Sequence, residues 1–146
     1  MNSIALESAN LIADKALQKG RNLKFAPLTV VVLDAGGQMK VLKREDNSSL
    51  LRPEIALGKA WGVLGMGFGG RELARRAELV PAFFTALSVM SDGRMVPVAG
   101  GVLIKNSEGQ VIGSVGISGE TSDNDEICAV SGIEAAGMIA DTGRKD

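Results

Sequence analysis

The chain has 146 residues, which suits a single domain with a substantial core. It contains no histidine, no tyrosine and one cysteine, so its own residues exclude a Ser-His-Asp triad, a Cys-His dyad, histidine-ligated zinc or haem, and an internal disulfide. A formal net charge of −1 offers no attraction to nucleic acid or to an anionic membrane. The sequence shows neither an apolar run of the ~20 residues that a membrane span needs nor a signal-peptide pattern, so we expect a soluble cytoplasmic protein.

The first part of the sequence predicts a helix and then a hairpin. Small and apolar residues at helical spacing predict a helix over residues 3–19, and Gly20 is expected to end it. Residues 28–34 form an almost continuous apolar run, which is typical of a strand covered on both faces. Residues 34–37 have the composition of a tight turn, and residues 38–44 return as a second strand with alternating polarity.

The middle of the sequence predicts helices. Pro53 suits a first helical turn, so a helix is expected over about residues 52–64. The glycine-rich run 65–70 breaks this helix. Because the run follows a helix and lacks the lysine of a phosphate-binding loop, we interpret it as a connection. A further helical segment over residues 71–90 contains Pro81, which is expected to split it in two.

The last third of the sequence predicts a second hairpin and a closing helix. β-Formers at residues 102–104 and 111–117 predict two strands joined by a turn. Ser122 and Asp125 have the spacing of a capping box at the start of a helix over about residues 123–141. The order α-β-β-α-α-β-β-α pairs the strands antiparallel, which predicts an α+β fold with helices packed on an antiparallel sheet. No linker or repeat interrupts this order, so we treat the whole chain as one domain.

Three cations are candidates for holding a ligand. Arg44 ends the second strand, and Arg52 and Lys59 lie about two turns apart on the following helix. A guanidinium matches a carboxylate through two hydrogen bonds, so this set suits a carboxylate or propionate group. The alternative is a solvated surface, or bridges to Asp46 or Glu54.

Glu120, Asp123, Asp125 and Glu126 form an acidic cluster at the start of the last helix. The helix dipole alone stabilises carboxylates at this position. The alternative is a carboxylate site for magnesium, calcium or iron, without help from imidazole.

Pro97, Gly100 and Gly101 precede the third strand. Two glycines here either bring backbone N–H groups close to a ligand or form a bulge. Cys128 lies on an apolar helix face, and we interpret it as a small buried residue rather than a nucleophile. Residues 143–146 are expected to form a frayed tail.

Four runs of the sequence together resemble the GlcG/HbpS family, which also includes the C-terminal domain of PduO-type corrinoid adenosyltransferases. They are residues 30–46, 53–67, 97–104 and 111–132, and they carry Asp-Ala-Gly-Gly, Pro-x-x-Gly-Gly and Gly-x-Ser-Gly-(x)₅-Asp-Glu in that order. The resemblance implies a profilin-like fold, with a central antiparallel sheet of about five strands, helices on both faces, and assembly into homo-oligomers. It also associates the chain with haem binding, degradation or sensing and with corrinoid metabolism, so haem or a corrinoid is the cofactor that it implies.

The resemblance places eleven residues at structural or pocket-forming positions: Asp34, Gly36, Gly37, Lys59, Pro97, Gly100, Gly101, Ser118, Gly119, Asp125 and Glu126. From these residues and the charged candidates we expect a ligand site drawn from Arg44, Asp46, Arg52, Lys59, Pro97, Gly100, Gly101, Ser118, Glu120, Asp125 and Glu126. We assign no metal ligand and no catalytic residue.

The sequence departs from the family pattern beside the expected pocket. Residues 47–52 and 68–72 differ from the stretches that are usual in the family. No histidine is present to ligate haem iron. Haem would therefore be held by Met, Cys128, Lys or Thr, or lie unligated in an apolar cleft, and a ligand other than the family's best-known one stays open.

Three functions remain open at this point. The first is a non-enzymatic protein that holds a tetrapyrrole or another carboxylated small molecule in a cleft between subunits, anchored by Arg44, Arg52 and Lys59. The second is a small catabolic enzyme that isomerises, hydrates or tautomerises a carboxylated, aromatic-derived substrate, with Lys59 or a carboxylate moving the proton. The third is a structural or protein-interaction oligomer.

Overall fold

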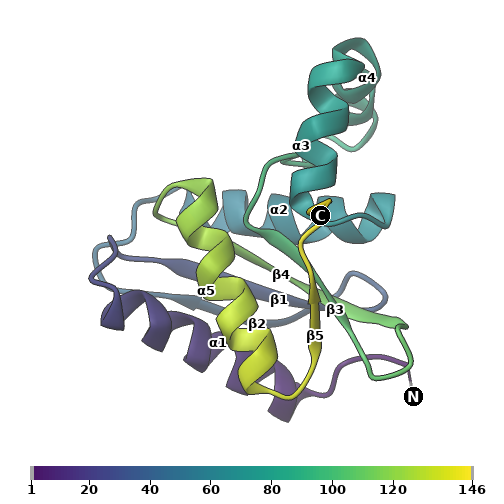
Figure 1. Ribbon diagram of the computed structural model, residues 1–146. Helices are drawn as coiled ribbons and strands as arrows, with labels where there is room; N and C mark the ends of the chain where they lie inside the picture. The colour runs from purple at the N-terminus through teal and green to yellow at the C-terminus, as the bar shows by residue number, and fades with distance from the viewer. Residues whose placement is uncertain (1, 146) are drawn as a thin grey trace.

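The structure, a computed structural model, describes residues 2–145 (Figure 1). Within these residues, no helix is both long enough and apolar enough to cross a membrane. In chain order the elements are α1 (Leu6–Asn22), β1 (Thr29–Asp34), β2 (Met39–Arg44), α2 (Arg52–Met66), α3 (Gly70–Leu79), α4 (Pro81–Met90), β3 (Gly101–Lys105), β4 (Val111–Ser118), α5 (Ser122–Ala135) and β5 (Ile139–Asp141).

The strands of residues 2–145 form one five-stranded sheet in the order β2-β1-β4-β3-β5. Every neighbouring pair in this sheet is antiparallel. The two predicted hairpins, β1–β2 and β3–β4, are both present, and the pairing of β1 with β4 joins them at the centre. The predicted α+β fold with a central antiparallel sheet is confirmed.

Strand β1 shows how the sheet is covered on both faces. Val30 and Val32 pack into a core with α1 and α5, whereas Val31 and Leu33 pack with Ala56 of α2. Successive residues of a strand point to opposite faces, so a strand between two layers must be apolar at nearly every position. Figure 1 shows the same arrangement, with α1 and α5 on one face of the sheet and α2 on the other.

Two glycines allow the helices to approach their neighbours closely. A Cβ on Gly116 of β4 would overlap the carbonyl oxygen of Ala56 on α2. A Cβ on Gly132 of α5 would overlap the carbonyl oxygen of Ile12 on α1. Since any other residue would bring that Cβ, Gly116 sets the spacing between the sheet and α2, and Gly132 sets the spacing between α5 and α1 within one layer.

The boundaries of the first and last predicted helices differ from the prediction, and α1 begins at Leu6 instead of residue 3. Helix α1 continues to Asn22, and Gly20, which was expected to end it, lies buried inside it. Helix α5 begins after Thr121, whose Oγ1 accepts a hydrogen bond of 3.2 Å from Asn124 N. The predicted capping box, with Ser122 as the cap, is therefore wrong by one residue, because the preceding threonine takes the capping role.

The predicted last helix is wrong at its C-terminal end. Helix α5 ends at Ala135, and Gly137 reverses the chain with a φ of +77°. Residues Ile139–Asp141 then form β5, which pairs with β3 at the edge of the sheet. A strand of three residues shows too little alternation to be distinguished from the end of an amphipathic helix.

Helices α3 and α4 project from the body of the molecule as an arm, residues 70–90 (Figure 1). Pro81 begins α4, so the predicted split at this proline is confirmed. The arm leaves several large apolar side chains exposed: Leu79, Val80, Phe83, Val89 and Met90.

The segment after β5 is held against the base of the arm. Arg71 N donates a hydrogen bond of 3.0 Å to the carbonyl oxygen of Thr142. A Cβ on Gly69 would overlap the backbone of Thr142 and Gly143, so only glycine permits this contact. The prediction of a frayed tail is therefore wrong for Gly143, whereas Asp146 lies outside the described residues.

Candidate functional site

Candidate residues on α2 and α5 meet in a buried ion pair. Lys59 of α2 is 3% exposed and Asp125 of α5 is 0% exposed. Lys59 Nζ lies 3.0 Å from Asp125 Oδ2 and donates a second hydrogen bond, of 2.9 Å, to the carbonyl oxygen of Ile117. Asp125 Oδ1 accepts a hydrogen bond of 3.0 Å from Glu120 N. The pair therefore ties the first turn of α5 to α2 across the end of β4.

Two of the candidate glycines make room for this lysine. Gly100 has a φ of +104°, and a Cβ there would lie 2.9 Å from Lys59 Nζ. A Cβ on Gly101 would lie 2.5 Å from the carbonyl oxygen of Lys59. Both glycines are buried, so the structure explains them by close packing on α2.

Burial dominates the protonation behaviour of the ion pair. It lowers the pKa of Lys59, and the charge of Asp125 opposes that change. Burial likewise raises the pKa of Asp125, and the charge of Lys59 and the hydrogen bond from Glu120 N oppose it. Each charged group thus stabilises the charged form of the other, and neither faces solvent.

Arg52 lies beside this ion pair. Its Nη1 donates a hydrogen bond of 3.0 Å to Ser118 Oγ, and its Nε donates one of 3.2 Å to Ser49 Oγ. The positive charge of Arg52 contributes to lowering the pKa of both Lys59 and Asp125. Within residues 2–145, no carboxylate forms an ion pair with Arg52. The structure therefore brings together two of the three candidate cations.

Arg44 and Asp46 lie apart from the buried pair. Both are exposed and line a shallow cavity of about 510 Å³ with Arg21 and Pro27. Pro97 lines a different cavity, of about 250 Å³, between α4 and the segment before β3. The eleven candidate residues thus do not form a single site.

The acidic cluster at the start of α5 also divides between different partners. Glu120 Oε2 accepts a hydrogen bond of 2.7 Å from Ala26 N, and this bond is the main cause that lowers the pKa of Glu120. Asp125 faces Lys59, and Glu126 faces Arg71. Residues 2–145 contain no group of three or more carboxylate or thiol side chains placed to hold a metal ion.

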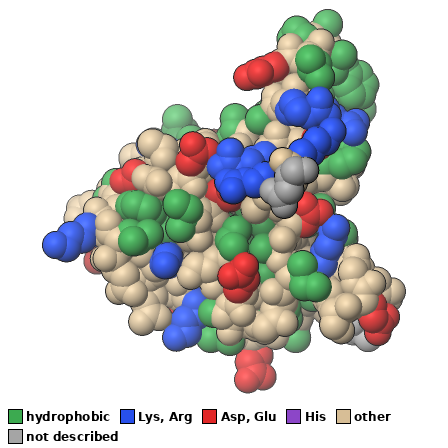
Figure 2. Space-filling view, viewed as in Figure 1, with side chains coloured by type: hydrophobic (Ala, Val, Ile, Leu, Met, Phe, Trp, Pro, Cys, Tyr) green, Lys and Arg blue, Asp and Glu red, His purple; other side chains and the backbone are tan. Residues whose placement is uncertain are grey.

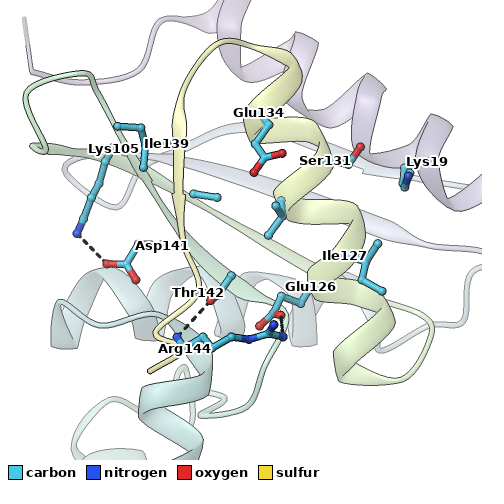
Figure 3. Close-up of a pocket in the computed structure, with 12 residues that line it drawn as sticks. Lys19, Lys105, Glu126, Ile127, Ser131, Glu134, Ile139, Asp141, Thr142 and Arg144 are labelled. Carbon is cyan, nitrogen blue, oxygen red and sulfur yellow. Dashed lines mark hydrogen bonds and ion pairs between the residues drawn. The ribbon is translucent and has the colours of Figure 1, made fainter. Parts of the chain in front are cut away.

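Glu126 lines an open groove of about 770 Å³ (Figure 3). The groove runs between the outer face of α5, strand β5 and the segment that follows it. Its walls combine apolar side chains with groups of both charges: Lys19, Lys105, Glu126, Ile127, Val130, Ser131, Glu134, Ile139, Ala140, Asp141, Thr142 and Arg144.

At the end of the groove next to the arm, the charged side chains are linked by ion pairs that centre on Glu126. Arg71 Nε lies 2.8 Å from Glu126 Oε2 and donates a hydrogen bond of 3.0 Å to Oε1. Arg71 also bridges to Asp123, and Arg144 Nη2 lies 3.5 Å from Glu126 Oε1. The Oε2 atom is buried without a hydrogen-bond partner of good geometry. Figure 2 shows basic side chains gathered where the arm meets the body, which is the region of Arg71 and Arg144.

Sequence reasoning found Glu126 but missed the rest of the groove. The sequence predicts Asp141 at the end of a helix and Arg144 in a frayed tail, and no sequence pattern singles out Lys105 or Lys19. Lys105 Nζ pairs with Asp141 at 2.7 Å across the edge of the sheet. Ile139 could have indicated the extra strand, because it is an apolar residue that follows Gly137, a residue type that commonly ends a helix.

The fold and these features define an α+β protein whose antiparallel sheet is covered by helices on both faces and whose surface carries an open groove with charged ends. The family model described as "Haem degrading protein HbpS-like" matches residues 4–134. The chain therefore belongs to the HbpS-like family.

Individual relatives agree with this assignment. The chain is 27% identical over 133 residues to the corrinoid adenosyltransferase PduO of Citrobacter freundii, covering 91% of this chain and 39% of that protein. The chain thus spans well under half the length of that enzyme. It is also 27% identical to an uncharacterised 15.0 kDa protein of the dhaT–dhaS intergenic region of Citrobacter freundii, covering 90% of this chain and 91% of the relative.

Solved structures show the same fold. The Klebsiella pneumoniae protein ORFY superposes with a TM-score of 0.83 at 25% identity, covering 92% of this chain and 90% of that chain. The complex of PduOC with haem superposes with a TM-score of 0.81 at 26% identity, covering 97% of this chain and 99% of that chain. HbpS itself superposes with a TM-score of 0.78 at 24% identity, covering 91% of this chain and 89% of that one.

Proposed function

We propose that this chain binds a carboxylated planar molecule, with haem as the first candidate, in the groove between α5 and β5. The groove itself is the observation that carries this proposal. Its volume of about 770 Å³ lies within the range of roughly 300–1,000 Å³ that is usual for small-molecule sites. Similarity to the PduOC–haem complex and to the HbpS-like family supports the choice of a tetrapyrrole as the first ligand to test.

The walls of the groove suit a molecule with a flat apolar body and acidic edges. Ile127 and Ile139 are 43% and 49% exposed, so they offer apolar surface to a ligand. Lys19, Lys105 and Arg144 provide cations around that surface. A guanidinium such as that of Arg144 can take a carboxylate through two hydrogen bonds.

The donors in the groove fit the acidic edges of haem better than its iron. No imidazole, thiol or thioether is found among the residues that line the groove. The available side-chain donors are amines, hydroxyls and carboxylates, so the proposal assigns binding to the apolar walls and the cations. Bound haem would supply its own iron chemistry, and this chain's residues would hold the ring and its carboxylates.

Haemin titration of the purified protein, followed by Soret absorbance and by mass stoichiometry, tests the proposal. We expect a saturable complex that Ile139→Asp abolishes, because a carboxylate would occupy the apolar wall. Arg144→Ala should weaken binding at least about ten-fold, which is the effect of losing one charge-assisted contact. The absence of a saturable Soret change would overturn the proposal.

Arg52→Ala is the matched control, since it removes a guanidinium beside the buried ion pair instead of one in the groove. We expect haemin affinity to be unchanged in this variant. A loss of affinity in Arg52→Ala, with none in Arg144→Ala, would move the ligand to the region originally expected around Arg52 and Lys59 and would refute the groove.

We also propose that the arm mediates assembly with a second copy of the chain. Its exposed Leu79, Phe83 and Met90 form an apolar surface of the kind that marks an interaction site. Light scattering after size-exclusion chromatography should show an oligomer that Phe83→Asp converts to a monomer. A monomeric parent protein at all concentrations would contradict this proposal.

A further inference from the structure

A second cavity lies on the other face of the sheet and shares no residue with the groove. It measures about 670 Å³ and is formed by the β1–β2 turn, the outer side of α2 and the turn after α4. Helix α2 packs on the face opposite α1 and α5, so a molecule in this cavity and one in the groove would not touch each other (Figure 1).

Two of the glycines that line this cavity lie in turns at open surface. Gly37 and Gly93 have φ values of +81° and +74°, and a Cβ on either would meet nothing within 4 Å. Gly58 plays a different part, because its carbonyl oxygen accepts a hydrogen bond of 3.2 Å from Val96 N. A Cβ on Gly58 would lie 2.6 Å from Val96 Cγ2, so this glycine lets the segment that carries Arg94 lie directly against α2.

Arg94 is held in place over an aromatic ring. Its guanidinium carbon lies 4.4 Å from the centre of the Trp61 ring, and its Nε donates a hydrogen bond of 2.8 Å to the carbonyl oxygen of Ser91. Both contacts fix the guanidinium plane before any ligand arrives, which lowers the entropic cost of binding to it. Among residues 2–145, no carboxylate lies within ion-pair distance of Arg94.

Two carboxylates line the same cavity. Glu54 and Asp92 are exposed, and neither forms an ion pair within the described part of the chain. With Arg94 they give the cavity a formal charge of −1, so a simple acid would approach two carboxylates to reach one guanidinium. A molecule that carries both charges satisfies the cation and the anions together.

We propose that this cavity binds a small zwitterion of the α-amino acid class. The ligand's carboxylate pairs with Arg94, and its ammonium group pairs with Glu54 or Asp92. An apolar ligand side chain lies against Met39, Leu57 and Trp61, which supply the apolar part of the wall. The proposal stands on its own residues and does not depend on haem binding in the groove.

The test uses Trp61, which is the only tryptophan in a sequence without tyrosine. Each proteinogenic amino acid except tryptophan is titrated singly to about 10 mM, a range that covers weak affinities, and Trp61 fluorescence and titration calorimetry are followed together. We expect saturable changes in both signals for amino acids with apolar side chains. No saturable change in either signal for any of them would overturn the proposal.

Matched analogues of the best ligand test its chemical class. For leucine these are 3-methylbutylamine, which lacks the carboxylate, and 4-methylpentanoate, which lacks the amine. Each should bind at least about ten-fold more weakly than the amino acid, since each forfeits one charged contact. If either analogue binds as tightly as leucine, the proposal that the ligand must carry both charges is refuted.

Variants test the residues. Arg94→Gln should weaken the amino acid at least about ten-fold by calorimetry while leaving the binding of 3-methylbutylamine unchanged, because that analogue has no carboxylate to lose. Lys15→Gln, an exposed change on α1, should leave both affinities unchanged. If Arg94→Gln weakens both compounds equally, the guanidinium is not the carboxylate partner and the proposal fails.

Discussion

Asp125 and Glu126 are adjacent carboxylates on the same helix, and both are buried, yet they belong to different parts of the molecule. Consecutive residues on a helix point about 100° apart, so Asp125 faces α2 and Glu126 faces the groove. The partner of Asp125, the side chain of Lys59, is 4% exposed. The side chains that pair with Glu126 are 29% exposed for Arg71 and 60% for Arg144. The exposure of the partner, more than that of the carboxylate, separates a closed structural pair from one that a ligand can reach.

The largest effect should come from breaking the closed pair. Lys59→Met leaves Asp125 buried without a countercharge, so we expect a loss of about 3–5 kcal/mol in the free energy of unfolding, measured with urea. The double variant Lys59→Met/Asp125→Leu should recover much of this loss, because no charge remains to be stabilised. A loss below about 1 kcal/mol in the single variant would show that the pair is not closed.

The next effect concerns Cys128, which lies on the same helix and is fully buried. Burial, together with the charge of Asp125, raises the pKa of its thiol to about 11. Because the folded pKa lies above the unfolded value of about 8.5, the unfolded state loses this proton first as the pH rises. Stability from this group is therefore complete below pH ~8.5 and falls by about 3 kcal/mol as the pH approaches 11.

The measurement compares urea unfolding of the parent and of Cys128→Ala between neutral and alkaline pH. The parent should lose more stability than the variant over this interval. Parallel pH profiles would contradict the assigned cause.

The solvent-accessible pairs of Glu126 with Arg71 and Arg144 should contribute less to the free energy of unfolding than the Lys59–Asp125 pair. Glu126→Gln keeps a hydrogen-bond acceptor for Arg71 and removes the charge, so we expect a loss of about 1 kcal/mol. Salt should shrink this difference, since the cations of the pair reach solvent. Urea unfolding in low salt and in about 1 M NaCl checks both statements. A loss equal to that of Lys59→Met would erase the distinction between the two pairs.

The smallest effect on stability should come from Arg144→Ala. This side chain is 60% exposed and lies 3.5 Å from Glu126 Oε1, so its removal should cost less than about 0.5 kcal/mol. Thermal unfolding of the apo-protein would detect a larger change. Stability near that of the parent, combined with weaker haemin binding, would identify Arg144 as a ligand contact instead of a structural one.

Local signals explain what the sequence predicted correctly. Both hairpins follow from runs of β-formers around turn residues, and the split of the arm follows from Pro81, whose effect needs no partner. The family resemblance added the expectation of about five strands, although the sequence pattern itself indicated only four. The fifth strand forms because Ile139–Asp141 pairs with the edge strand β3. This pairing depends on the tertiary structure and not on the local sequence.

The candidate site was harder to predict, since its parts lie far apart along the chain. Lys59 and Asp125 were both candidates, but their pairing joins residues separated by 66 positions and closes them to solvent. The groove draws residues from α1, β3, α5, β5 and the segment after β5, so no local pattern could reveal it. The cavity beside Trp61 depends likewise on Arg94, which only the packing of Gly58 brings onto α2.

The contact between Gly69 and Thr142 has a mechanical consequence. The chain enters the arm at the same point where the wall of the groove ends, and Arg71 N donates its hydrogen bond to the carbonyl oxygen of Thr142 there. The base of the arm and the wall of the groove therefore share a backbone contact at Thr142, which lines the groove. If the arm carries the proposed contact with a second copy, thermodynamic linkage requires that a ligand whose affinity for the groove depends on that contact also changes the strength of the contact.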